Sequence, residues 1–599
     1  MRYVQTDVAI IGAGGGGLRA AIAIAESDPT LDIALISKVY PMRSHTVAAE
    51  GGAAAVVKEQ DSFDWHFNDT VSGGDWLCDQ DVVEYFVENS PSEMVQMEHW
   101  GCPWSRQENG KVNVRAFGGM KIERTWFAAD KTGFHILHTL FQTSIKYPKI
   151  KRFDEHFCLE LIIINDKVQG VLVQDIAEGE IYAIQAKSVI IATGGAGRVY
   201  RYNTNGGIVT GDGMSLAYRN GVPLRDMEFV QYHPTGLPGT GILMTEGCRG
   251  ESGVLTNKDE YRYLQDYELG PETPLGQPQN KYMELGPRDK LSQAFWQEEQ
   301  KGKTLTHPIW GSYVNLDLRH LGEEKINERL PFIRELAKSY VGKDPVYDPI
   351  PVRPTVHYTM GGIETDIHCA TKLDGLYAVG ECASTGLHGA NRLGSNSLAE
   401  LLVFGKVAGE HAAQCSLNRE HQDVELLLSH AMAIEKRLRN QFNGDKTESI
   451  AGIRAELGKT MEAGVGIYRT EETMQVACDK IATLKQRYAN IKLSDDSSVF
   501  NTEWFSALEL GYLLDIGQAM AHSAIQRKES RGSHQRLDEF TARDDVNYLK
   551  HSLAYYVEGE GPRIDYSQVT ITKSQPAKRR YGAASESKDQ QSKNKEPSS

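Results

Sequence analysis

The sequence predicts an α/β protein in which a Rossmann-like dinucleotide-binding domain is built from separated segments of the chain. A glycine-rich fingerprint follows an apolar strand at the N-terminus, and two further strand-and-glycine segments occur near residues 190 and 380. Residues 425–550 instead show the apolar spacing of amphipathic helices. The chain therefore combines a discontinuous nucleotide domain, material inserted between its segments, and a helical domain.

Length and charge exclude some classes of protein. The 599 residues suffice for roughly two to four domains. The net charge is −15, and no strongly basic block precedes residue 578. Because nucleic-acid binding needs clustered Lys and Arg, we expect no nucleic-acid partner. A local basic pocket for a small anion is still compatible with this charge.

The cysteines and the hydropathy pattern bear on metal content and location. No two cysteines form a Cys-x-x-Cys pair, which argues against structural zinc, c-type haem or a ferredoxin-type cluster and predicts no metal site. The N-terminus lacks the apolar core of a signal peptide, and no run of about 18 apolar residues occurs. We expect a cytosolic protein with reduced thiols that reaches a membrane only through partners. The eight cysteines are Cys78, Cys102, Cys158, Cys248, Cys369, Cys382, Cys415 and Cys478.

The first βαβ unit is predicted from residues 7–11 as a strand, 18–25 as a helix and 33–36 as a second strand. The glycines between strand and helix satisfy G-x-G-x-x-G. In this pattern the first glycine permits a tight turn, the second admits a pyrophosphate and the third lets the helix pack on the strand. The residues of this turn, all candidate cofactor contacts, are Gly12, Ala13, Gly14, Gly15, Gly16 and Gly17.

The acidic residue expected at the end of the second strand is missing, since the chain reads Ile36-Ser37-Lys38 there. We expect the Ser37 hydroxyl to take its place at the ribose. This departure argues against an ordinary NAD site and leaves FAD open.

Two downstream segments support FAD. The strand at 189–192 is followed by Gly194 and Gly195, whose small size admits a second backbone segment to a dinucleotide. Glu381 ends another predicted strand and suits a ribose hydroxyl. Ser395 to Leu398 are predicted to open a helix whose N-terminus faces the flavin. Asp212 is a further candidate contact.

Several ordered motifs carry a family resemblance that covers residues 5–575. These motifs are Ser44-His45-Thr46, Ala192 to Gly197, Gln231-Tyr232-His233-Pro234-Thr235, Thr245 to Gly250, Pro287-Arg288-Asp289, Val356 to Gly362 and His388 to Leu398. The chain resembles the flavoprotein subunits of the succinate dehydrogenase/fumarate reductase family.

The resemblance implies a domain plan. It comprises an FAD-binding domain, an inserted α+β capping domain, a helical domain and a small C-terminal domain. The expected boundaries are 1–52, 131–239 and 356–420 for the FAD-binding domain, 53–130 and 240–355 for the capping domain, 421–550 for the helical domain, 551–577 for the C-terminal segment and 578–599 for a disordered tail.

The resemblance also implies that His45 carries the flavin covalently, through the 8α-methyl carbon. Attachment to a ring nitrogen makes the flavin easier to reduce, as succinate oxidation requires. The other expected cofactor contacts, besides the glycine turn, are Ser37, Lys38, Ser44, Thr46, Glu50, Gly51, Gly52, His156, Phe157, Cys158, Gly194, Gly195, Asp212, His357, Tyr358, Glu381, Arg392, Ser395, Ser397 and Leu398.

For the substrate, the resemblance implies two clamps for a small dicarboxylate. His233 and Thr245 hold one carboxylate, and His357 and Arg392 hold the other. Arginine suits this role because its planar fork binds both carboxylate oxygens. Phe117 is expected to pack over the substrate. Arg288 is the expected proton donor, with Glu246 and Arg249 as its relay.

Within the family, Glu50 favours a quinol:fumarate reductase, because many succinate dehydrogenases carry Gln at that position. Expected partners are fumarate or succinate, an iron–sulfur subunit and two small membrane-anchor subunits that handle quinone. This places the chain at the cytoplasmic face of a bacterial inner membrane. The alternatives are a succinate dehydrogenase subunit, L-aspartate oxidase, which binds FAD noncovalently, and a non-catalytic flavin-binding module.

Overall fold

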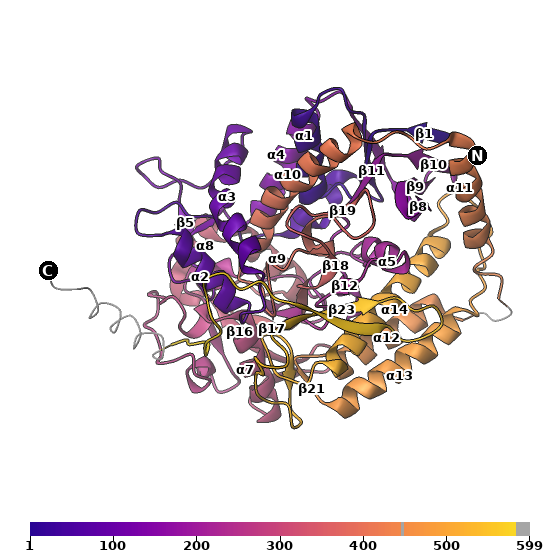
Figure 1. Cartoon of the computed structure of the whole chain (residues 1–599). Helices are drawn as coiled ribbons and strands as arrows, with labels where there is room; N and C mark the ends of the chain where they lie inside the picture. The colour runs from indigo at the N-terminus through magenta and orange to yellow at the C-terminus, as the bar shows by residue number, and fades with distance from the viewer. Residues whose placement is uncertain (445–447, 583–599) are drawn as a thin grey trace.

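A parallel five-stranded sheet forms the centre of the nucleotide domain. The computed structural model describes residues 1–444 and 448–582 (Figure 1). The central sheet has the order β19 (Leu376–Ala378), β11 (Ser188–Ile191), β2 (Val8–Ile11), β3 (Ile33–Ser37) and β7 (Ile150–Asp154). All four strand pairs are parallel. The strands predicted near residues 10, 35, 190 and 377 are thereby confirmed as neighbours in one sheet.

Two helices cover one face of this sheet. Helix α1 (Gly15–Ser27) follows β2 and lies beside α10 (Asn396–Leu417), as Figure 1 shows at the top of the molecule. Small residues allow the two helices to approach closely: a Cβ at Gly409 would lie 2.5 Å from the Ala20 carbonyl oxygen. The close packing fixes both helix N-termini relative to the sheet.

A second sheet has the order β1 (Tyr3–Gln5), β10 (Ile181–Gln185), β9 (Lys167–Asp175) and β8 (His156–Ile164). Helices α4 (Thr132–Ser144) and α5 (Asp212–Arg219) flank the nucleotide domain. Two short 3₁₀ turns, η1 (Pro41–Arg43) and η2 (His45–Ala48), follow β3.

The segment 240–355 forms most of a separate lobe with its own hydrophobic core. Its sheet has the order β13 (Val230–Gly236), β17 (Ile350–Thr359), β16 (Gly311–Asp317) and β14 (Val254–Thr256), with β15 (Leu305–His307) paired to β16. Its helices are α6 (Gly247–Gly250), α7 (Arg288–Gln300), α8 (Gly322–Arg329) and α9 (Pro331–Val341). Strands β13 and β17 pair with each other and connect this lobe to the nucleotide domain.

The segment 53–130, expected to belong to the same lobe, packs differently. Its small sheet has the order β4 (Ala53–Ala54), β6 (Thr125–Trp126) and β5 (Val114–Arg115), and its helices are α2 (Phe63–Gly73) and α3 (Gln80–His99). The apolar side chains of α2 and α3 share one core with α1 and α10. This segment is therefore anchored on the nucleotide domain.

Four helices form the region predicted to be helical: α11 (Val424–Arg439), α12 (Ile450–Gly464), α13 (Glu471–Tyr488) and α14 (Thr502–Gln526). Helices α12, α13 and α14 gather on one side of the molecule in Figure 1. Their apolar faces share a core with β8 and β9. The helical domain predicted over 421–550 is helical only as far as Gln526, because no helix follows that residue in the described chain.

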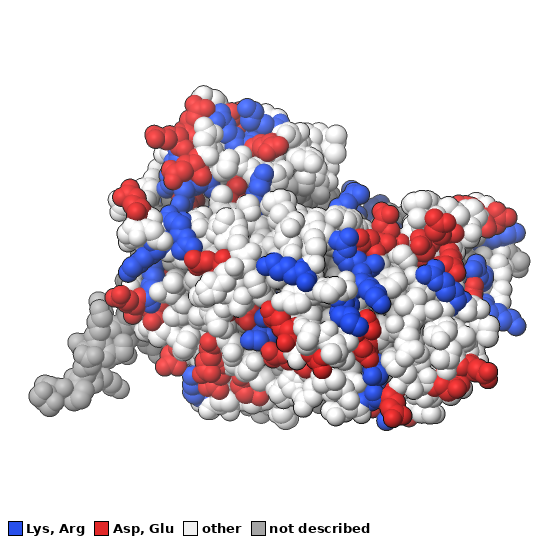
Figure 2. Space-filling view, turned by 90° about the horizontal axis from the view of Figure 1, so that it is seen from above, with Lys and Arg blue, Asp and Glu red and all other residues white. Residues whose placement is uncertain are grey.

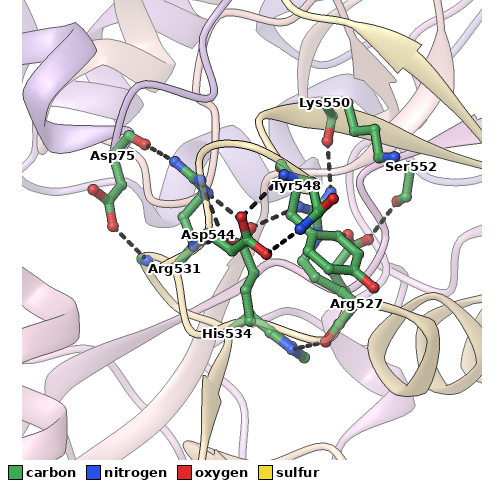
Figure 3. A network of polar contacts seen from close by, with 12 residues as sticks. Asp75, Arg527, Arg531, His534, Asp544, Tyr548, Lys550 and Ser552 are labelled. Atoms are coloured by element: carbon green, nitrogen blue, oxygen red, sulfur yellow. Dashed lines mark hydrogen bonds and ion pairs between the residues drawn. The ribbon is translucent and has the colours of Figure 1, made fainter. Parts of the chain in front are cut away.

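Residues 527–548 form a loop held by buried ion pairs, shown in Figure 3. Arg527 pairs with Glu228 and Glu529, and Arg531 pairs with Glu529 at 2.8 Å, all with fully buried side chains. His534 Nδ1 lies 2.7 Å from Arg469 Nη1. Charged residues are more often solvated than buried, so the sequence pattern gave no indication of this network.

The chain ends in a sheet with the order β20 (Ala383–Ser384), β18 (Gly362–Glu364), β12 (Leu224–Arg225), β23 (Lys550–Tyr555) and β24 (Arg563–Gln568). Two short strands, β21 (Tyr468–Arg469) and β22 (Gln535–Arg536), form a separate parallel pair. The disordered tail expected from residue 578 begins too early in that prediction, because Arg579 is ordered and forms an ion pair with Asp289 at 2.7 Å. The remainder of that expected tail, 583–599, lies outside the described residues.

Surface charge is mixed. Figure 2 shows Lys and Arg interspersed with Asp and Glu on the face seen from above. Among the described residues, no helix combines the length and apolar character needed to cross a bilayer.

Candidate active site

The glycine turn after β2 is built for close backbone approach. Gly12 has a φ of +110°, and a Cβ there would lie 2.2 Å from the Ala192 carbonyl oxygen. A Cβ at Gly17 would lie 1.9 Å from the Gly12 carbonyl oxygen. Both positions therefore require glycine. The turn brings the N-terminus of α1 to the edge of the sheet, where its free N–H groups favour an anion.

A cavity of about 610 Å³ opens in front of this turn. Its size lies within the usual range of cofactor sites. Of the expected contacts, the residues that line it are Gly12, Ala13, Gly14, Gly15, Gly16, Ser37, Lys38, Ser44, His45, Thr46, Glu50, His156, Cys158, Gly194, Gly195, Asp212, His357, Tyr358, Glu381, Ser397 and Leu398. Segments far apart in sequence thus converge on one space.

Several expected contacts do not line this cavity, and each has another placement. Phe157 stacks on Phe505 with ring centroids 5.2 Å apart, because strand alternation points it away from His156 and Cys158. Gly17 packs against the turn itself. The others are Gly51, Gly52, Arg392 and Ser395.

Gly52, Ser395 and Arg392 instead contact segments that form the cavity wall. Gly52 has a φ of +141°, and a Cβ there would lie 2.4 Å from the Trp126 carbonyl oxygen. Ser395 adopts a left-handed conformation directly before α10, and its Oγ lies 3.0 Å from Thr125 Oγ1. Arg392 Nη1 donates to Ser397 Oγ at 2.9 Å. They shape the start of α10, whose N-terminus faces the cavity through Ser397 and Leu398.

His45 lies on the cavity wall at the start of η2. The Gly206 N–H donates to its Nδ1 at 3.3 Å, and Asn205 Nδ2 lies 3.4 Å from its Nε2. Burial lowers the pKa of His45 to about 4, so its imidazole is neutral at pH 7. A neutral imidazole has the free nitrogen lone pair that a nucleophile needs. The sequence motif gave no indication of the contacts from Asn205 and Gly206.

Other residues that line the cavity are charged. Lys38 pairs with Asp212 at 3.0 Å and with Glu509 at 2.9 Å. Glu381 Oε1 accepts from the Thr359 N–H at 3.0 Å, and burial raises the pKa of Glu381 to about 7. A Cβ at Gly195 would lie 2.3 Å from Glu381 Oε1, so this position also needs glycine.

Buried polar atoms around the cavity lack partners among the described residues. They include Ser44 Oγ, Thr193 Oγ1 and Glu50 Oε2. Burial, with Asp130 nearby, holds the pKa of the Glu50 carboxyl well above its ordinary value. Unsatisfied buried groups are costly in a finished protein, so these atoms fit a polar ligand in the cavity. The residues present therefore fit FAD.

Adjacent to the cavity, a buried cluster brings the expected substrate residues together. Strand β13 carries His233, and its partner β17 carries His357, with the two ring centroids 5.1 Å apart. Arg392 comes from the loop before α10, and Arg288 is the first residue of α7. His233 Nε2 is buried without a hydrogen-bond partner among the described residues.

Thr245 and Phe117 complete this cluster. Both are buried, and a Cβ at Gly51 would lie 2.7 Å from Phe117 Cζ and 3.7 Å from Thr245 Oγ1. On the other side, a Cβ at Gly394 would lie 3.0 Å from Phe117 Cδ1 and 3.6 Å from Arg288 Nη2. The phenyl ring therefore sits between the flavin-side loop and the arginines.

Gln231 is a site residue for which sequence reasoning assigned no role. Its Oε1 accepts from Arg288 Nη1 and from Arg392 Nη2, both at 3.0 Å. Its Nε2 donates to the Arg392 carbonyl oxygen at 2.7 Å. Period-two alternation places Gln231 on the same face of β13 as His233, and that was the available signal.

The cluster is electropositive. Burial and the proximity of Arg288 lower the pKa of Arg392 to about 10. Burial and the same arginine hold the pKa of His233 well below its ordinary value. Mutual repulsion of cations that lack enough carboxylate partners favours the binding of a dianion.

Arg288 leads into a chain of buried ionic groups. Its Nε donates to Glu246 Oε2 at 2.6 Å, and Arg249 Nη2 lies 3.5 Å from the same oxygen. Although burial favours the neutral acid, Arg288 and Arg249 lower the pKa of Glu246. The proton relay predicted from Arg249 through Glu246 to Arg288 is thus an uninterrupted series of contacts. No group of three or more His, Cys, Asp or Glu within the described residues is arranged to hold a metal.

Comparison with known proteins agrees with this fold and site. Residues 7–398 match the family model "FAD binding domain", and residues 454–581 match "Fumarate reductase flavoprotein C-term". A fumarate reductase flavoprotein subunit from Serratia sp. is 65% identical over 99% of both chains, and the one from Escherichia coli K12 is 63% identical over 98% of both. A succinate dehydrogenase flavoprotein subunit from Rickettsia bellii is 40% identical over 94% of this chain and 95% of its own.

The solved structures point the same way. A quinol fumarate reductase subunit from E. coli superposes with a TM-score of 0.95 at 64% identity, covering 97% of this chain and 99% of that one. The fold and site define an FAD-binding flavoprotein oxidoreductase. Within that class, the chain belongs to the fumarate reductase flavoprotein family.

Proposed function

We propose that this chain is the catalytic flavoprotein subunit of a membrane-associated quinol:fumarate reductase, which reduces fumarate to succinate and also catalyses the reverse reaction. The observation that carries the proposal is the buried cluster in which Arg288 meets Gln231 and Glu246 beside the unpartnered His233 Nε2. The cluster has the charge and the donors for one small dicarboxylate.

Two pairs of residues bind the two carboxylates of the substrate. His233 and Thr245 hold one carboxylate, and His357 and Arg392 hold the other. Gln231 fixes the spacing of Arg288 and Arg392, because one amide oxygen accepts from both. Fixing both carboxylates twists one of them out of the alkene plane, which makes a carbon of fumarate electrophilic.

FAD, when bound in the adjacent cavity, supplies hydride transfer to or from the substrate carbon. Arg288 donates the proton that completes reduction at the neighbouring carbon. Glu246 then returns a proton to Arg288, and Arg249 supplies Glu246. Fumarate thus gains one hydride and one proton to become succinate.

The FAD is held covalently through His45 in this proposal. The neutral imidazole of His45 provides the nucleophilic nitrogen. The Gly206 backbone N–H and the Asn205 side chain orient the imidazole ring. L-aspartate oxidase, which binds FAD noncovalently, would not need this histidine.

The electron-supplying partners belong to the proposal as well. The eight cysteines are all unpaired and separated, and in the described chain they form no cluster site. An iron–sulfur subunit and two membrane-anchor subunits would therefore carry electrons from quinol. Through them the chain would sit at the cytoplasmic face of an inner membrane.

The proposal is tested by fumarate-dependent oxidation of a reduced viologen dye. Arg288→Ala should lower turnover by at least about 10²-fold, because general acid catalysis contributes that much or more. Binding of fumarate, followed by its effect on flavin absorbance, should persist. Arg319→Ala, at an exposed arginine in the same lobe, is the control. Substantial turnover by Arg288→Ala would remove Arg288 as the acid.

A further inference from the structure

A second cavity, of about 830 Å³, lies on the other side of the substrate cluster. Its wall includes the exposed residues Trp65, Gln277 and Arg580 and, at the opposite end, the buried Arg288 and Arg392. The cavity therefore runs from solvent to the two arginines that the proposed reaction uses.

The walls of this cavity are cationic, although the whole chain carries a net charge of −15. Beyond Arg288 and Arg392, the lining includes Lys121, Lys281, Lys578, Arg579 and Arg580. Glu123 is the acidic residue among the lining residues, and it forms an ion pair with Lys58 at 2.6 Å.

Part of this positive charge is neutralised and part is not. Lys281 pairs with Asp69 at 3.0 Å, and Arg579 pairs with Asp289 at 2.7 Å. Lys578 and Arg580 are exposed and form no ion pair with the rest of the described chain. Arg579 Nε and Tyr581 Oη are buried without hydrogen-bond partners among the same residues. The cavity thus keeps both excess charge and unused donors.

The inner end of the cavity contacts the substrate cluster directly. Gly394 lines the cavity, and a Cβ there would lie 3.0 Å from Phe117 and 3.6 Å from Arg288 Nη2. Gly118 and Gly119 line the same end. Because these three positions are glycines, they add no side chain of their own between the cavity and the cluster.

We infer that this cavity is the entry vestibule for the dicarboxylate, which its cationic wall attracts and passes to Arg288 and Arg392. The inference rests on the proposed function, because it takes a dianion as the substrate. Fixed charges that line a concave wall focus the field and speed the association of an oppositely charged ligand. This attraction weakens as salt screens the charges, over a Debye length of about 10 Å at 0.1 M.

The test measures how fast fumarate associates with the intact, oxidised complex, from flavin absorbance after rapid mixing. The double variant Lys578→Gln/Arg580→Gln should lower the association rate constant by about 3- to 10-fold at low ionic strength. The difference should vanish at high salt, while turnover at saturating fumarate stays unchanged. Gln277→Glu, which adds a carboxylate to the same wall from another segment, should have the same effect.

Two controls separate local from global charge. Lys578→Arg/Arg580→Lys keeps the charge and should keep the wild-type association rate. Lys146→Gln/Lys492→Gln removes two exposed charges that do not line the cavity, and should change the rate little.

An unchanged association rate in both vestibule variants, or an equal decrease in the Lys146/Lys492 control, would overturn the vestibule. Loss of saturated turnover with unchanged association would also overturn it, and would indicate a separate anion site that acts on turnover. A wild-type complex that neither binds nor reduces fumarate would instead refute the proposed function.

Discussion

Single residues at this site owe their chemistry to neighbours that are distant in sequence. His45 and Glu50 were recognisable from their motif, and Arg288, His233, His357 and Arg392 from theirs. What the motifs did not contain is the contact of Gln231 with both arginines, or of Gly206 with His45. Those contacts depend on how β13 and the loop after η3 (Gly197–Val199) fold back over the cavity, and local sequence does not encode that.

At His45, replacement by serine should leave FAD bound but noncovalent. Fumarate reduction should be partly kept and succinate oxidation lost, because the noncovalent flavin is harder to reduce. Flavin fluorescence in acid-precipitated protein measures the covalent link, and the exposed His138→Ser serves as control. Wild-type rates of succinate oxidation in His45→Ser would contradict the assignment.

At the scale of elements, periodicity predicted strands β2, β3, β11 and β19, helix α1 and a helical domain, and buried charge explains why the helices end before residue 550. The sequence predicts a helical domain up to residue 550, yet the chain after α14 folds as a loop around Arg527, Glu529 and Arg531 (Figure 3). Glu228, two residues before β13, joins this network. The loop thereby anchors the strand that carries Gln231 and His233.

The Arg527 network should be sensitive to the loss of one partner. Arg527→Leu leaves the buried Glu228 and Glu529 carboxylates without their shared cation, and this should lower stability by about 3–5 kcal/mol. The thermal midpoint of unfolding, measured by circular dichroism, reports the loss. Lys528→Gln, at the exposed neighbouring position, should melt like the wild type. Equal midpoints for both variants would show that the network contributes no stability.

A buried histidine in β23 should make stability depend on pH. Although burial opposes its charge, Asp226 at 2.6 Å and Asp79 at 3.3 Å raise the pKa of His551 to about 9. Since the folded state binds this proton more tightly than the unfolded chain, the contribution is complete below about pH 6.5 and is lost as the pH rises through 9. It amounts to at most about 3 kcal/mol.

Unfolding by urea at pH 6, 7.5 and 9 measures this effect. The wild type should lose stability over that range, and His551→Gln should lose much less. His99→Gln, at an exposed histidine, should follow the wild type. A His551→Gln variant with the full wild-type decline would assign the pH dependence to other groups.

At the scale of the whole molecule, the sequence order of segments predicted a discontinuous nucleotide domain, and one parallel sheet confirms it. The division of the inserted material was harder to foresee. Residues 53–130 share a core with α1 and α10, whereas most of 240–355 has its own core, because the apolar side chains of α2 and α3 pack against α1 and α10 as well as against each other. The active-site cluster lies where these parts meet.

The central claim is that the complex that contains this chain works as a fumarate reductase. Its most direct test compares, in the intact complex, the rate of fumarate reduction by quinol with the rate of succinate oxidation by quinone. Glu50, which is buried beside the cofactor cavity and favours a quinol:fumarate reductase over a succinate dehydrogenase, leads us to expect faster fumarate reduction. Faster succinate oxidation would contradict the proposal and favour a succinate dehydrogenase.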